Sequence, residues 1–171
     1  MKLEKFISLL NWRQIIIHFV ASCFFVYGFK TLATLYNLEL LEAYLYSNNG
    51  YKMEVLNSKK YDSNAFSNLF IFPYYFAIIG LLVTFLISLI ISIKKKWSWF
   101  NSLIMFLLTY FLYRFDLLGW SYFKNVFLLI GKMFNDNFLS VLVNGTLMLM
   151  IGLLFFFSKI STRFIESKII K

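Results

Sequence analysis

The side chains that could do chemistry in this mostly apolar chain begin with its single histidine. His18 and Ser22 lie one helical turn apart, and Lys30 follows in the same apolar stretch. An ionisable side chain inside a membrane-spanning helix is by default a functional hypothesis, here proton relay or ligand contact. A single histidine more commonly packs between helices with a hydrogen bond. Both interpretations stay open at this stage.

Small and hydroxyl-bearing residues recur at helical spacing in two later apolar stretches. Such residues let membrane helices approach closely and form hydrogen bonds across the contact. An asparagine in hydrocarbon also needs a partner, because an unsatisfied amide there is costly. The predicted helix-packing or partner-contact residues are Ser98, Ser102, Thr109, Ser140, Asn144, Gly145 and Gly152.

Three charged residues lie toward the far end of their apolar stretches. Lys30 and Asp116 reach similar depth if each is measured along a helix from its lysine-rich end, at about 1.5 Å per residue. We therefore expect either a Lys30–Asp116 pair or a charge cluster that also includes Arg114. The alternative is that Lys30 and Arg114 extend separately to the lipid headgroups.

The residue inventory argues against most membrane-embedded catalysis. One histidine cannot supply two-histidine haem ligation or a zinc site of two histidines and a carboxylate. Cys23 and His18 lie on different helix faces, and neither a P-loop nor a dinucleotide-binding fingerprint occurs. We expect no catalytic, cofactor or metal site, and the sequence has no motif diagnostic of a family.

Four apolar stretches must position these residues. They cover residues 14–36, 69–93, 97–117 and 138–158, and each is about as long as the roughly 20 helical residues that cross a bilayer. Since 60% of all residues are hydrophobic and mean hydropathy is +0.71, lipid is the expected solvent. A backbone in lipid must satisfy its own hydrogen bonds, so the spans must be helices. The fold class predicted for residues 1–171 is a single all-α, polytopic bundle of four transmembrane helices.

Basic residues border these spans unevenly. They dominate before the first span, between the second and third, and after the fourth, where the sequence predicts a basic tail at residues 159–171. The positive-inside rule places these regions, and both termini, in the cytoplasm. The abundant Phe, Asn, Lys and Ile are compatible with an AT-rich bacterial genome, so the predicted location is a bacterial inner membrane. The net charge of +9 then favours anionic lipid headgroups on the cytoplasmic side over nucleic acid, because the cations form no globular patch.

Two connecting segments are predicted on the outer side. Residues 37–68 form an outer loop that begins as an amphipathic extension of the first helix. Residues 118–135 carry Ser121, Lys124 and Lys132 largely on one helical side, which is typical of an interfacial helix between the third and fourth spans. A fifth span is the alternative, but it would place a lysine near mid-membrane.

Function is inferred here by elimination. We expect a non-catalytic accessory, scaffold or assembly subunit of a larger cell-envelope membrane complex, with membrane lipids and other membrane protein subunits as partners. The competing interpretation is a small transporter or channel-forming homo-oligomer in which His18 responds to protons.

Overall fold

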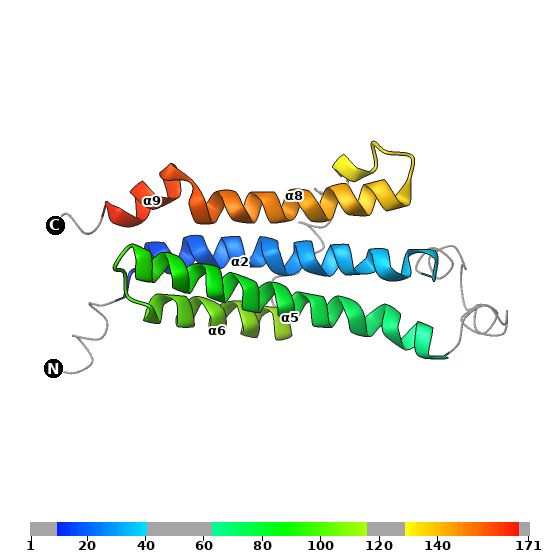
Figure 1. Ribbon diagram of the computed structural model, residues 1–171, viewed down its shortest axis with the longest axis horizontal. Coiled ribbons are helices and arrows are strands. Elements are labelled where there is room, and N and C mark those ends of the chain that lie inside the picture. Colours follow the sequence, from blue (N-terminus) through cyan, green and yellow to red (C-terminus); the bar gives the residue numbers. More distant parts are fainter. Residues whose placement is uncertain (1–9, 41–62, 116–128, 168–171) are drawn as a thin grey trace.

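The computed structural model describes residues 10–40, 63–115 and 129–167, and this part of the chain is all-α as predicted. Figure 1 shows its helices running side by side. They are α2 (Trp12–Ala33), the 3-10 helix η1 (Thr34–Asn37), α5 (Ser63–Lys94), α6 (Phe100–Arg114), α8 (Asn137–Phe157) and α9 (Lys159–Glu166).

Helix α2 is the centre of the bundle. In Figure 1 it runs between α8 on one side and the α5–α6 hairpin on the other, and it contacts all three helices. The start of α2, the α5–α6 turn and α9 meet at one end. There the backbone N–H of Asn11 donates to Asn101 Oδ1 at 3.2 Å, and Lys95 forms an ion pair with Glu166 at 3.1 Å. We call this end of the bundle, which carries Lys94, Lys95 and Lys96, the lysine-rich end.

Three helical segments are long and apolar enough to cross a membrane: Trp12–Leu40, Ser67–Lys94 and Asn137–Phe157. The chain is therefore an integral membrane protein by helix length and composition. Helix α6 has 15 residues, which corresponds to about 22 Å and falls short of a typical span.

Helix boundaries follow local capping chemistry. The Asp136 carboxylate caps α8 by accepting from the backbone N–H groups of Phe138, at 2.7 Å, and Leu139. The Ser158 hydroxyl accepts from Ser161 N at 3.0 Å and so begins α9 directly after α8 ends. At the end of α5, Lys96 adopts a left-handed conformation with φ of 55°. This residue type rarely does so, and the conformation turns the chain sharply toward α6.

Several predicted boundaries need correction. Helix α5 begins at Ser63 rather than at residue 69, because the polar residues before the apolar stretch continue the helix. The interfacial helix predicted to reach residue 135 is helical only at residues 129–131 of its described part, and residues 132–135 form turns and bends. The predicted basic tail contains α9, with Ser161 and Ile165 buried. Residues 41–62 of the outer loop and 118–128 of the interfacial segment lie outside the described residues.

Glycines set the spacing between α2 and α8. A Cβ atom on Gly28 would lie 3.1 Å from the Gly145 carbonyl oxygen, and one on Gly145 would lie 3.3 Å from the Gly28 carbonyl oxygen. A Cβ on Gly152 would lie 2.5 Å from Cδ2 of the buried Phe25 ring. The two helices therefore approach along a seam in which side chains larger than hydrogen do not fit.

Candidate functional site: a buried polar network

Helices α2 and α5 present matched rows of polar side chains to each other. On α2, Gln14, His18 and Ser22 recur every four residues, and on the antiparallel α5, Ser92, Ser88 and Thr84 do the same. Residues four apart lie on one helix face, so the two rows meet pairwise. The side-chain distances are 2.7 Å for Gln14–Ser92, 2.7 Å for His18–Ser88 and 2.8 Å for Ser22–Thr84. All six residues are buried.

Helix α6 completes this polar network from a third side. Asn101 Nδ2 donates to Gln14 Oε1 at 2.8 Å, so the Gln14 amide binds α5 with its nitrogen and α6 with its oxygen. The Ser102 hydroxyl lies 2.8 Å from Ser88 Oγ and 3.0 Å from Ser92 Oγ. Gln14 of α2 thus binds both α5 and α6, and Ser102 holds α6 against α5 through two serines.

The direction of each bond follows from counting hydroxyl protons. Ser92 donates its proton to the Ser88 carbonyl at 2.8 Å, and Ser88 donates to Ser102. Ser102 must then donate to Ser92, because Ser92 has no second proton. Ser88 has also used its proton, so His18 Nδ1 is the donor toward Ser88.

This order limits what His18 can do chemically. A base that activates a serine must accept the hydroxyl proton, whereas His18 donates to Ser88. Ser22, its neighbour in sequence, bonds instead to Thr84, whose own proton goes to the Leu81 carbonyl at 2.8 Å. His18 Nε2 is buried without a hydrogen-bond partner among the described residues, and the ring lies edge-on to Phe156 at a centroid distance of 5.1 Å.

The network also ends inside the bundle. From Gln14 to Ser22 it extends about 12 Å along α2 from the lysine-rich end, at ~1.5 Å per residue. Beyond it lies an apolar cluster of Val26, Ala77 and Leu81. Its last hydroxyl proton is donated to a backbone carbonyl of α5. The geometry joins helices and, among these residues, provides no polar route to the opposite end.

The other predicted packing residues occupy separate places. Ser98 is half-buried in the turn before α6, and the buried Thr109 donates to the Met105 carbonyl of its own helix at 2.9 Å. Ser140 and Asn144 are buried on α8 beside Gly131, whereas Gly145 and Gly152 face α2. Neither amide atom of Asn144 has a hydrogen-bond partner among the described residues.

The charged residues predicted at the far boundary are only partly described. Lys30 Nζ lies over the rings of Tyr27 and Tyr113, at 5.6 and 5.8 Å from their centroids. Arg114 is exposed at the end of α6. Asp116 lies outside the described residues, so its pairing with Lys30 stays a prediction.

Sequence reasoning missed five of the eight network residues: Gln14, Thr84, Ser88, Ser92 and Asn101. The available signal was the four-residue repeat of polar residues on both α2 and α5. Within the described ranges, no group of three or more His, Cys, Asp or Glu residues could hold a metal ion. Comparison with protein-family models gave no match, and neither a curated protein nor a solved structure matched the chain.

Proposed function

We propose that this chain is a non-catalytic integral membrane protein that serves as an accessory, scaffold or assembly subunit of a larger membrane complex. The observation that carries the proposal is how its polar groups are used. Eight polar side chains of α2, α5 and α6 join these three helices to each other in a buried network. That use leaves apolar outer faces for lipid and for partner helices.

Helix α8 is where we place the partner contact. Only 22% of its most apolar stretch is buried within the chain, compared with 50% for that of Trp12–Leu40, which includes α2. Its main helix neighbour is α2, and its outward side exposes Met150, Leu153 and Leu154. Thr146, on an exposed position of α8, donates to the Leu142 carbonyl at 2.7 Å and so presents no unsatisfied hydroxyl to an apolar partner.

The proposed threading is four passages in a bacterial cytoplasmic membrane, with both termini on the cytoplasmic side. Its support is that the start of α2, the α5–α6 turn and α9 meet at the lysine-rich end. Fluorescent and alkaline-phosphatase fusions at each terminus and in residues 41–62 test it. Opposite compartments for the two termini would overturn the threading.

Native purification tests the function. A tagged chain extracted in a mild detergent should retain another membrane subunit in fixed stoichiometry. The double variant Met150→Ala, Leu154→Ala should lose that subunit, because both side chains are more than half exposed on α8. The matched control Leu86→Ala, Ile90→Ala removes equally exposed side chains from α5 and should retain it.

The transporter or channel alternative makes the opposite prediction. A lone oligomer that carries ions or solute across liposomes, with flux that His18→Ala abolishes at unchanged abundance, would overturn the subunit proposal. What speaks against the alternative is that the His18 network ends on backbone carbonyls and is followed by the apolar cluster of Val26, Ala77 and Leu81.

A further inference from the structure

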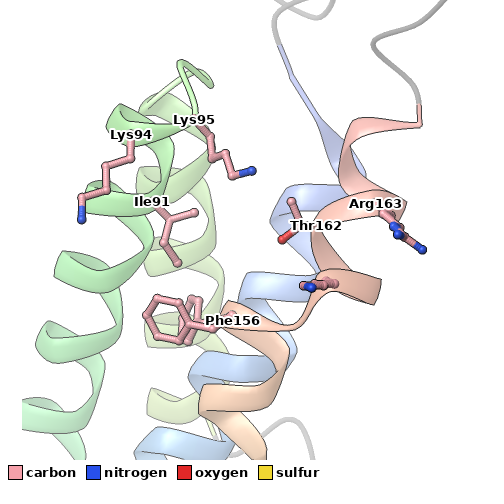
Figure 2. A pocket seen from close by; sticks show the side chains of 8 residues that line it. Ile91, Lys94, Lys95, Phe156, Thr162 and Arg163 are labelled. Atoms are coloured by element: carbon pink, nitrogen blue, oxygen red, sulfur yellow. The ribbon is translucent and has the colours of Figure 1, made fainter.

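A cleft opens at the lysine-rich end between α5 and the α8–α9 corner. Its volume is about 470 Å³, within the range of small-molecule binding clefts, which is roughly 300–1,000 Å³. Figure 2 shows Phe156 at its base and Lys95 pointing across the gap toward α9. The lining residues are Ile91, Lys94, Lys95, Phe156, Phe157, Lys159, Thr162 and Arg163.

The lining combines cations at the rim with an apolar wall. Four of the eight lining residues are cationic, and no lining residue is acidic. Lys95 is paired with Glu166 of α9 at 3.1 Å, so its charge is already compensated. Among the described residues, no carboxylate lies within ion-pair distance of Lys94, Lys159 or Arg163, so three positive charges are uncompensated there. Ile91, Phe156 and Phe157 face the same space without charge.

The position of the cleft narrows the choice of ligand. It lies where α5 and α8, two helices suited to crossing a membrane, reach their ends. This is the depth at which lipid phosphates meet the upper part of the acyl chains. Basic pockets between membrane helices recognise anionic headgroups for this reason. A free phosphate would use the cations but would leave the apolar wall uncovered.

We propose that this cleft is a specific binding site for one anionic phospholipid. Lys94, Lys159 and Arg163 bind its phosphate, and one acyl chain lies against Ile91 and Phe157. In Figure 2 the Lys94 and Arg163 side chains stand on the two flanks of the cleft, turned outward. Both are exposed, so their flexible stems can close on a headgroup. The site is independent of the partner-subunit proposal, which concerns the outward side of α8.

Lipid retention measured by native mass spectrometry tests the site. The purified chain, reconstituted in nanodiscs of equal phosphatidylglycerol and phosphatidylcholine and then released, should keep one phosphatidylglycerol. Each cation near an anionic headgroup changes affinity about fivefold, so Lys94→Gln, Lys159→Gln, Arg163→Gln together should weaken retention on the order of 100-fold. The control Lys96→Gln, Arg114→Gln, Lys132→Gln also removes three exposed cations, all outside the cleft, and should change retention less than about threefold.

A variant that is expected to bind the lipid more tightly distinguishes loss of the site from misfolding, because a misfolded protein would not gain affinity. Glu166→Gln releases Lys95 from its ion pair without removing a cation, so it should strengthen retention about fivefold. Glycerol 3-phosphate at millimolar concentration should not displace the lipid, because it lacks the acyl chain. The proposal would be overturned if the cleft and control triple variants lost the lipid equally, or if the chain retained phosphatidylcholine instead. Weaker retention in Glu166→Gln, or displacement of the lipid by glycerol 3-phosphate, would overturn it as well.

Discussion

Substitution of Gln14 should be the most informative single test of how much the buried network stabilises the bundle. Gln14 Nε2 donates to Ser92 Oγ at 2.7 Å, and Gln14 Oε1 accepts from Asn101 Nδ2 at 2.8 Å. Hydrogen bonds between membrane helices contribute about 0.6 kcal/mol on average and up to about 1.7 kcal/mol each. Gln14→Leu preserves most of the side-chain volume and removes both bonds, so the free energy of unfolding should fall by about 1–3 kcal/mol.

A double-mutant cycle isolates one of these bonds. Asn101→Leu removes the same Gln14–Asn101 bond from the α6 side. The double variant should therefore be more stable than the sum of the singles predicts, by about 0.6–1.7 kcal/mol. The measurement is reversible unfolding in mixed detergent micelles, followed by tryptophan fluorescence and far-ultraviolet circular dichroism.

The control is Thr146→Val on α8. Its hydroxyl bonds only to carbonyls of its own helix, Leu142 and Val143, so the free energy of unfolding should change by less than about 0.5 kcal/mol. A Gln14–Asn101 coupling below about 0.3 kcal/mol would refute the reasoning, because it would mean that water or headgroups replace the bond as effectively as the partner helix does.

Three further outcomes concern residues of α2 and α8, and Gly80→Ala on α5 serves as the comparison for the first. Gly152→Ala should destabilise the fold by about 1–3 kcal/mol, because its methyl group would lie 2.5 Å from a carbon of the buried Phe25 ring. Gly80→Ala should cost less, since the nearest atom there is 3.1 Å away. Asn144→Leu should raise the unfolding free energy by about 1 kcal/mol, because it removes a buried amide that has no partner among the described residues. The Cys23 thiol, on a residue only 5% exposed, should react with a membrane-permeant maleimide only after unfolding.

For each of these three predictions, one outcome would contradict the packing on which it rests. A Gly152→Ala protein as stable as wild type would mean that α2 and α8 separate without penalty. Loss of stability in Asn144→Leu would show that the amide is bonded in the membrane. Rapid labelling of Cys23 in native membranes would contradict the packing of that part of α2. Unfolding in micelles checks the first two, and gel-shift labelling checks the third.

The start of a membrane helix could be predicted from the sequence where the apolar stretch begins directly after a capping residue. Helix α8 begins one residue before the predicted start, because Asp136 caps it and the apolar stretch follows at once. Helix α6 begins at Phe100 rather than at residue 97, because the left-handed Lys96 and the residues after it form the turn. Apolar composition indicates which residues favour lipid, whereas a helix start depends on backbone geometry that composition does not contain.

Only part of the candidate site could be predicted from the sequence, and the reason differs from that for the helix boundaries. Ser102 stood out because it lies in a stripe of polar residues on one helix. The Gln14 and Ser92 contacts depend on how α2 and α5 are aligned against each other, and one helix's sequence does not contain that alignment. The matching four-residue repeats on both helices would have indicated it if the two had been compared as a pair.

The central position of α2 has a consequence for biosynthesis. His18 leaves the ribosome 70 residues before its partner Ser88, and Gln14 leaves 78 residues before Ser92. If α2 enters the bilayer before α5, its polar side chains face lipid or the insertion machinery until α5 is inserted beside them. Chains stalled between these two points would expose unsatisfied donors in hydrocarbon. They would therefore be the natural substrates for membrane quality-control proteases.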